Sequence, residues 1–165
     1  MPQPLATFEY PRELRDGLTL ALERLNDETG FAGLLERDPL MAAELERVLI
    51  CSEYATGVMT RYPEVLAALV DSGRLHRPAA AGEYREGLLA AAPADLAEPE
   101  FMRALRLFRH RELVRIVFRD LAGWSDTTET LSDLSRLADA CIMSALDYAT
   151  SLVAQRCGRP PDVNG

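Results

Sequence analysis

The stretch from Phe101 to Leu121 constrains the fold of this chain more than any other. It is long, rich in both arginine and large apolar residues, and free of proline and glycine. A stretch of this kind predicts an α-helix. On a helical wheel of about 100° per residue, one continuous arc of its second half is apolar. That arc consists of Leu113, Val114, Val117, Phe118 and Leu121.

An arginine stripe lies on the other side of the same helix. Arg111, Arg115 and Arg119 follow one another at intervals of four residues, and Glu112 lies close enough to Arg115 to pair with its guanidinium group. Ile116 interrupts this polar side, which indicates that the face is partly covered. The first interpretation is a face that is solvated or paired within the chain, where ion pairs contribute little. The second is a docking surface for another domain or an anionic partner, because arginine makes planar bidentate contacts.

The charge of the whole chain narrows the class of protein. Its formal net charge is −8, from 26 acidic and 18 basic residues. Nucleic-acid binding relies on an excess of Lys and Arg that neutralises phosphates, so this balance argues against it. The basic residues between 103 and 119 are the local exception, and they alternate with core positions and with Glu112 and Asp120. We therefore expect no nucleic-acid partner.

Cysteine usage and the N-terminal sequence favour a cytoplasmic protein. Cys51, Cys141 and Cys157 form no CxxC pair, and the first two lie in apolar helical patterns, so we expect small buried side chains in a reducing compartment. The chain begins MPQPLATFEY, without the basic and apolar regions of a signal peptide. No apolar run approaches the length of a membrane span, so we expect no membrane.

The rest of the chain also follows helical periodicity. Asp38 before Pro39 is a helix N-cap, and a kink is expected at Gly57. His76 is isolated in a loop, which is typical of an ordinary surface residue. Trp124 follows a helix end and is expected to fill the core. The expected helices cover residues 11–26, 31–37, 39–60, 63–72, 83–92, 101–121 and 127–157, and residues 1–10 form a tail.

The last expected helix is the longest and carries a regular apolar seam. Its members are spaced by three and four residues alternately, as in helices that pack at a shallow angle. The seam consists of Leu131, Leu134, Ala138, Cys141, Ala145, Tyr148 and Leu152. We expect the central helices to lie against it. The predicted fold class is therefore all-α, an antiparallel helical bundle with a long C-terminal helix.

No catalytic constellation can be assembled from the sequence. There is no nucleophile beside a base, no metal-ligand cluster and no glycine-rich loop after a strand. His110 lies between two arginines, which disfavour its protonated form. It could act as a base only if a carboxylate from elsewhere oriented it. We therefore expect no catalytic, cofactor-binding or metal-binding residue in this chain. Arg111, Arg115 and Arg119 are its candidate domain or partner interface.

Three segments resemble the N-terminal helical region of a known enzyme family. ICSEYATGVMTRYPEVLAALVDSG (Ile50–Gly73) is similar to its Ser-x-Tyr helix followed by a proline-started helix. MRALRLFRHRELVRIVFRDLAG (Met102–Gly123) resembles its LR-x-FR-x-x-E-x-x-RI-x-x-RDL signature, and TLSDLSRLADACIMSALDYA (Thr130–Ala149) its LS-x-LADA-x-x-x-x-AL helix. The family is that of the bifunctional glutamine synthetase adenylyltransferase/adenylyl-removing enzyme, and the resemblance covers residues 40–158.

The resemblance implies a large enzyme with two nucleotidyltransferase domains. One removes AMP from a tyrosine of glutamine synthetase by phosphorolysis and gives ADP, and the other attaches AMP from ATP. Both use Mg²⁺ held by aspartates. The implied partners are glutamine synthetase, the PII signalling protein and the chain's own downstream nucleotidyltransferase domain. The family's Gly-Lys-Leu-Gly-Gly and Asp-x-Asp segments follow the long helix and have no counterpart here.

On this interpretation the chain has three parts. Residues 1–37 are a variable N-terminal helical arm, residues 38–158 a helical bundle domain, and residues 159–165 the start of a linker to a nucleotidyltransferase domain. The chain is then a non-catalytic region that supports the adenylyl-removing domain. The alternative is a free-standing helical module that binds a partner or regulates it without chemistry. A reading frame that continues into a Gly-rich segment and an Asp-x-Asp strand supports the first.

Overall fold

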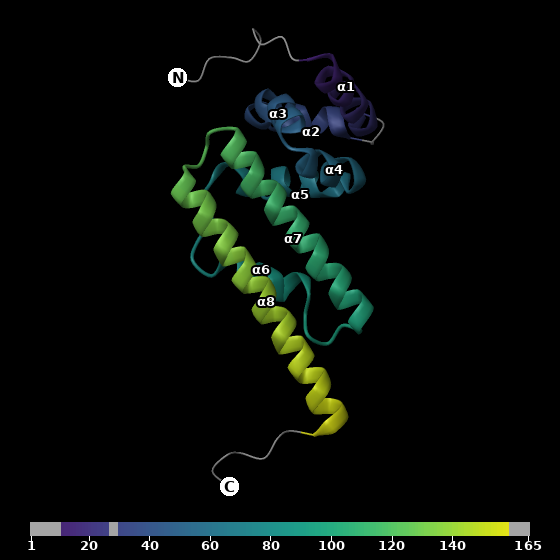
Figure 1. The fold of residues 1–165 in the computed structure, drawn as a ribbon, viewed down its shortest axis with the longest axis vertical. Helices are drawn as coiled ribbons and strands as arrows, with labels where there is room; N and C mark the ends of the chain where they lie inside the picture. The colour runs from purple at the N-terminus through teal and green to yellow at the C-terminus, as the bar shows by residue number, and fades with distance from the viewer. Residues whose placement is uncertain (1–10, 27–29, 159–165) are drawn as a thin grey trace. The chain divides into compact units, whose positions relative to one another are not determined.

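The computed structural model describes residues 11–26 and 30–158 (Figure 1). These residues form eight α-helices and one 3-10 turn, and no strand occurs among them. The expected tail at 1–10 and linker at 159–165 lie outside the described residues. The predicted all-α fold with a long C-terminal helix is confirmed. The elements are α1 (Arg12–Asn26), α2 (Phe31–Arg37), α3 (Pro39–Cys51), α4 (Glu53–Arg61), α5 (Pro63–Asp71), η2 (Arg74–His76), α6 (Glu83–Ala91), α7 (Glu98–Leu121) and α8 (Thr127–Cys157).

The chain divides into two compact units that alternate along the sequence. Unit 1 comprises Met1–Pro78 and His110–Leu131, and unit 2 comprises Ala79–Arg109 and Ser132–Gly165. Two of the boundaries between the units fall inside helices, one in α7 and one in α8. Each of these continuous helices therefore contributes residues to both units. The units are therefore not consecutive domains joined by linkers.

Unit 1 has an apolar core built from helices α1 to α5 and the second half of α7. Met41, Leu69 and Phe118 are among its fully buried side chains, and they come from α3, α5 and α7. The helices are short, and polar caps define their ends. The Asp38 carboxylate accepts a hydrogen bond from the Met41 backbone N–H at 3.0 Å, as predicted, and Pro39 occupies the first turn.

The predicted helix at 39–60 with a kink at Gly57 is wrong. The helix ends at Cys51 and a new one begins at Glu53. Ser52 separates them in an extended conformation, and its side chain accepts a hydrogen bond from the Ala55 backbone N–H at 3.1 Å. The break occurs because serine caps a new helix better than it continues an old one.

Helices α1 and α2 contribute to the same core as α3 to α5. Ala21 and Leu25 of α1 are buried, as are Phe31 and Leu34 of α2. The separation of an arm at 1–37 from a bundle at 38–158 stays a prediction. What the structure adds is that the described helices of the arm have a buried apolar side within unit 1.

Unit 2 contains α6, the first half of α7 and most of α8. The rings of Phe101 and Tyr148 stack with centroids 3.9 Å apart, and the Tyr148 hydroxyl donates a hydrogen bond to the Leu96 carbonyl at 2.9 Å. Helix α7 begins at Glu98, three residues earlier than expected, so that Pro99 lies in its first turn rather than in a loop. Proline is tolerated there because the first backbone N–H groups of a helix have no partner within it.

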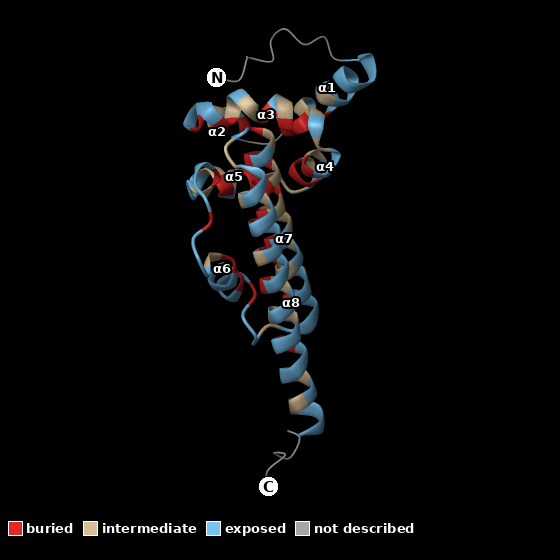
Figure 2. Ribbon diagram, turned by 60° about the vertical axis from the view of Figure 1, so that its left-hand side comes forward, coloured by how far each residue is buried: buried red, intermediate tan, exposed pale blue. Residues whose placement is uncertain are grey.

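The predicted seam of α8 is wrong over much of its length. The buried residues of this helix are Asp133, Leu137, Ala140 and Tyr148 (Figure 2). Of the seven predicted seam residues only Tyr148 is buried, while Leu131, Leu134 and Ala138 are exposed. Helix α8 is apolar on two sides, and the predicted seam lies between the buried side and the exposed one, so it shares only Tyr148 with the buried residues.

Two further expectations are corrected. Cys51 and Cys157 are exposed and Cys141 is half-buried, so they are not the buried side chains that their apolar surroundings suggested. Helix α8 is also long and apolar enough, by length and composition, to cross a membrane, although no run of that length was expected. Charged residues interrupt the apolar residues of α8, so a search for uninterrupted apolar runs misses this helix. The mean hydropathy over a window of residues averages across the interruptions and therefore detects it.

Candidate functional site

The arginine stripe of α7 belongs to a buried network of ion pairs in unit 1. Glu112 is fully buried, and three guanidinium groups converge on its carboxylate. Arg74 donates to both of its oxygens, at 2.7 and 3.0 Å, while Arg111 and Arg115 donate through Nε at 3.1 and 3.2 Å. The two-point contact from Arg74 joins η2 to α7 with defined geometry.

Arg115 and Arg119 also hold backbone carbonyl groups. Arg115, 1% exposed, donates to the Arg77 carbonyl at 3.2 Å. Arg119, 2% exposed, donates to the Leu75 carbonyl at 3.0 Å and the Trp124 carbonyl at 3.1 Å. Its Nε and Nη2 donate to Oε1 of Glu129 at 3.2 and 2.7 Å. These arginines therefore fix the segment after α5 and the turn between α7 and α8.

The observed contacts can be compared with the two interpretations of the arginine stripe. The arginine face is paired within the chain, and Ile116, which suggested cover, is 3% exposed. The prediction that Arg111, Arg115 and Arg119 form a domain or partner interface stays a prediction. Arg111, whose side chain is 30% exposed, is the member with the most surface accessible to a partner.

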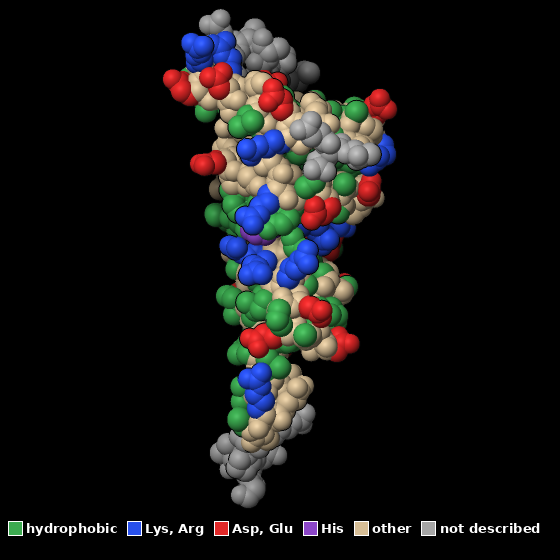
Figure 3. All heavy atoms as spheres, turned by 90° about the vertical axis from the view of Figure 1, so that its right-hand side faces the viewer, with side chains coloured by type: hydrophobic (Ala, Val, Ile, Leu, Met, Phe, Trp, Pro, Cys, Tyr) green, Lys and Arg blue, Asp and Glu red, His purple; other side chains and the backbone are tan. Residues whose placement is uncertain are grey.

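Exposed arginines lie earlier in the same helix. Arg103, Arg106 and Arg109 of unit 2 are exposed, in contrast to Arg115 and Arg119. Arginine side chains gather on the face drawn in Figure 3. The sequence left open whether the regular stripe is solvated, paired within the chain or a docking surface, because spacing reveals a common face but not whether that face is covered.

His76 is exposed, as the sequence predicted, but it also has two defined contacts. Its Nε2 lies 2.6 Å from Oδ2 of Asp38, and its ring lies 4.7 Å from that of Trp124. Asp38 therefore both caps α3 and pairs with His76. The expected role of Trp124 as a core residue is confirmed, since its ring packs against the core at 5.6 Å from Phe118.

His110 lies at a shallow hollow in unit 1. Its Nδ1 is 2.9 Å from the Tyr54 hydroxyl, and its ring stacks on Tyr62 at 5.9 Å. The hollow is also lined by Glu53, Gly57, Val58 and Arg61. The group that contacts Nδ1 of His110 is thus a phenol, whereas a carboxylate was expected to orient a catalytic base.

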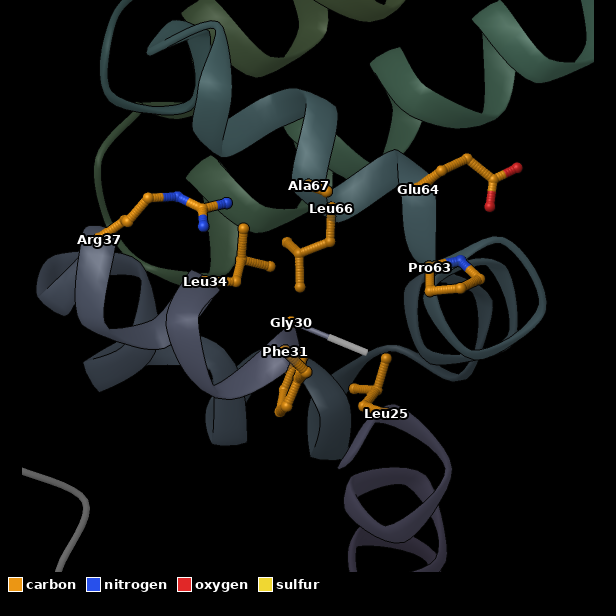
Figure 4. Close-up of a pocket in the computed structure, with 9 residues that line it drawn as sticks. All are labelled: Leu25, Gly30, Phe31, Leu34, Arg37, Pro63, Glu64, Leu66 and Ala67. Carbon is orange, nitrogen blue, oxygen red and sulfur yellow. The ribbon is translucent and has the colours of Figure 1, made fainter. Parts of the chain in front are cut away.

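A second cavity in unit 1 is mostly apolar. It has a volume of about 480 Å³ and lies among α1, α2 and α5 (Figure 4). Arg37 and Glu64 stand at its edge, and the Arg37 guanidinium lies 3.1 Å from the Asp71 carboxylate. The cavity is lined by Leu25, Gly30, Phe31, Leu34, Arg37, Pro63, Glu64, Leu66 and Ala67.

The general class of this protein follows from its fold and its buried polar contacts. They form an all-helical region whose buried polar groups join helices to the turns between them. Within residues 11–26 and 30–158, no group of three or more His, Cys, Asp or Glu could hold a metal ion.

Comparison with known proteins gives the family. The model of the family "Glutamate-ammonia ligase adenylyltransferase" matches residues 42–165. The chain therefore belongs to this family. No solved structure matches the chain significantly.

Similar curated proteins have one name, bifunctional glutamine synthetase adenylyltransferase/adenylyl-removing enzyme. The relative from Thioalkalivibrio sulfidiphilus is 40% identical over 73% of this chain and 12% of its own length. That from Nitrosococcus oceani is 37% identical over 82% of this chain and 15% of its own length. That from Vibrio parahaemolyticus is 30% identical over 97% of this chain and 17% of its own length. The chain thus spans less than a fifth of the length of these relatives.

Proposed function

We propose that this chain is the N-terminal helical region of an enzyme that attaches AMP to glutamine synthetase and removes it. The observation that carries the proposal is the family match over residues 42–165, together with relatives of that name at 30 to 40% identity. The region supports the adenylyl-removing nucleotidyltransferase domain and does no chemistry itself. The proposed location of the enzyme is the cytoplasm, where glutamine synthetase is its substrate and the PII protein its regulatory partner.

The chemistry of the full-length parent requires catalytic groups that residues outside this region must supply. Phosphorolysis breaks the phosphodiester between AMP and a tyrosine, transfers AMP to inorganic phosphate to give ADP, and returns a proton to the tyrosine oxygen. Mg²⁺ and ATP or ADP are the proposed cofactors of the parent. Nucleotidyl transfer with metal ions needs clustered carboxylates. The residues described here do not fit that requirement.

The buried network suits a supporting role. Glu112 and its three arginines hold η2 against α7, and Arg119 holds the turn that leads into α8. Because arginine contacts of this kind are directional, they hold the turn at the start of α8 in one conformation. A rigid start suits a long helix that leads to a following domain.

The test is phosphate-dependent release of AMP, as ADP, from adenylylated glutamine synthetase. We expect the full-length parent to catalyse it and the 165-residue chain not to. Release by the 165-residue chain would contradict the non-catalytic role, and an inactive parent would contradict the proposed activity. A stop codon directly after Gly165 in the natural reading frame would favour the alternative, a free-standing helical module that binds or regulates a partner.

A further inference from the structure

Helix α8 carries an apolar face that points away from the core of unit 2. We call it the α8 stripe, and its residues recur at intervals of four, four, four, three and four. All six are exposed, with Ile142 at 63% and Val153 at 59%. The α8 stripe consists of Leu134, Ala138, Ile142, Leu146, Ala149 and Val153.

The α8 stripe is wide, long and uncharged. On a helical wheel it lies within an arc of about 140° that contains no charged residue between residues 131 and 153. From Leu134 to Val153 it runs for about 30 Å along the helix axis. Single exposed apolar residues are normal on a protein surface, whereas a continuous apolar face of this size marks an interaction site.

The opposite side of α8 is already used. Asp133 is buried and pairs with Arg136, which donates to the Ala79 carbonyl at 3.3 Å, and Tyr148 stacks on Phe101. The α8 stripe is therefore a second packing face. Its small residues, Ala138 and Ala149, would allow a partner helix to approach closely.

A lipid bilayer suits this face poorly. A helix that crosses a membrane must be apolar around its circumference, but α8 carries exposed Asp139 at the edge of the stripe, and exposed Asp147 and buried Asp133 on the opposite side. Only one side of α8 requires cover. A protein surface that covers this side buries the apolar stripe and leaves the exposed carboxylates outside the contact.

The length of the relatives indicates what supplies that surface. They extend far beyond the part that this chain matches, since it covers 12 to 17% of them. The α8 stripe reaches Val153, close to the end of α8 at Cys157. The chain leaves α8 about one helical turn after Val153, so the polypeptide that follows is tethered close to the stripe. Tethering of this kind gives effective concentrations of about 1 mM or higher.

We propose that the α8 stripe is the docking surface for the polypeptide that follows residue 165 in the full-length parent. The proposal rests on the proposed function, because it requires that longer parent. It assigns the domain contact to an apolar face of α8, next to the tether. Ile142 and Leu146 lie at the centre of the contact.

The test measures the accessibility of the stripe directly. A cysteine is introduced as Ile142→Cys, with neighbouring Cys141→Ala, and its labelling by a small maleimide is followed on the corresponding peptide by mass spectrometry. We expect labelling in the full-length parent to be at least about tenfold slower than in the 165-residue chain, because a covered thiol reacts only when the contact opens. The matched control is Glu46→Cys on α3, an exposed position of unit 1, which should label equally fast in both proteins.

Each other outcome contradicts the proposal. Equal labelling of Ile142→Cys in the parent and the shorter chain would mean that nothing in the parent covers the stripe. Slow labelling already in the shorter chain that speeds up on dilution would assign the stripe to a second copy. Protection of the parent only by phosphatidylcholine vesicles would assign it to a lipid surface. A parent that is active in phosphorolysis but labels freely refutes the docking surface alone, whereas a protected but inactive parent refutes the proposed function alone.

Discussion

At the scale of single residues, Glu112 illustrates how one carboxylate can organise several cations. It is fully buried with Arg74, Arg111 and Arg115 around it, so each guanidinium group compensates part of the cost of removing this charge from water. Two of these cations are themselves well shielded, since the side chain of Arg74 is 15% exposed and that of Arg115 is 1% exposed. Removing one member leaves the others with incomplete partners.

This burial predicts a large effect of Arg119→Ala on stability. The substitution removes the hydrogen bonds to the Leu75 and Trp124 carbonyls and the ion pair with Glu129. We expect the free energy of unfolding to fall by about 3 to 5 kcal/mol. The control is Arg106→Ala, on an exposed position of the same helix, with an expected change within about 0.5 kcal/mol. Urea denaturation followed by circular dichroism measures both, and equal midpoints for the two variants would contradict the buried network.

Sequence reasoning found the members of this network but not its burial. Spacing placed Glu112 beside Arg115 correctly. The acceptors that make burial possible are the carbonyl groups of Leu75, 44 residues before Arg119, and of Arg77, 38 residues before Arg115. No local pattern indicates such a distant contact. The same reason explains His76, whose partners Asp38 and Trp124 come from distant segments.

At the scale of elements, the helix ends depend on caps that the sequence shows only in part. Asp38 before Pro39 was recognisable because both residues favour a helix start. Ser52 was not, because serine also occurs inside helices and the apolar pattern continues on both sides of it. The face of α8 that is buried could not be predicted either. Both faces are apolar, and only the position of α6 and α7 decides between them.

The cap at Ser52 can be tested by Ser52→Ala. The substitution removes the acceptor of the Ala55 backbone N–H at the start of α4. We expect a loss of about 1 kcal/mol in the free energy of unfolding, measured by urea denaturation. Ser52→Asp is the matched control, since aspartate can accept the same hydrogen bond and should retain most of the stability. If alanine and aspartate were equally stable, the two helices would not depend on this cap.

Two helical glycines give a matched pair of predictions for the stability of the chain, because an added Cβ atom has room at one and is crowded at the other. A Cβ atom at Gly57 of α4 would meet no atom within 4 Å, so Gly57→Ala should stabilise the chain by about 0.5 to 1 kcal/mol. A Cβ atom at Gly87 of α6 would lie 3.1 Å from Cε2 of Phe108, a buried ring. There the crowding should cancel or exceed the gain in helix propensity. Thermal unfolding of both variants checks this, and an equal gain at the two positions would contradict the packing of α6 on α7.

At the scale of the whole molecule, the two units share their longest helices. Helices α7 and α8 each pass from one unit into the other, so a change in either unit acts on a helix that also belongs to the other. The sequence predicted a continuous bundle over 38–158 because helical periodicity runs through both helices without a break. How side chains far apart in sequence group into units depends on long-range contacts, which periodicity does not encode.

In the full-length parent, one substitution can test the predicted partner interface on α7 without unfolding the chain. A triple replacement of Arg111, Arg115 and Arg119 is unsuitable, because two of these side chains are buried and their loss would unfold unit 1. Arg111→Ala alone leaves Glu112 paired with Arg74 and Arg115. If Arg111 contacts a partner, the variant should stay folded while phosphorolysis of adenylylated glutamine synthetase falls about five- to tenfold in kcat/KM, the loss of a single interface arginine.

The control for Arg111→Ala is the same substitution at an arginine outside the predicted interface. Arg12→Ala at the start of α1, an exposed position, should leave both the fold and kcat/KM unchanged. A normal kcat/KM for a folded Arg111→Ala variant would mean that the whole stripe serves the interior of unit 1. A loss for Arg111→Ala with an unchanged melting temperature would show instead that the same stripe fixes the fold through its buried members and reaches a partner through its most exposed one.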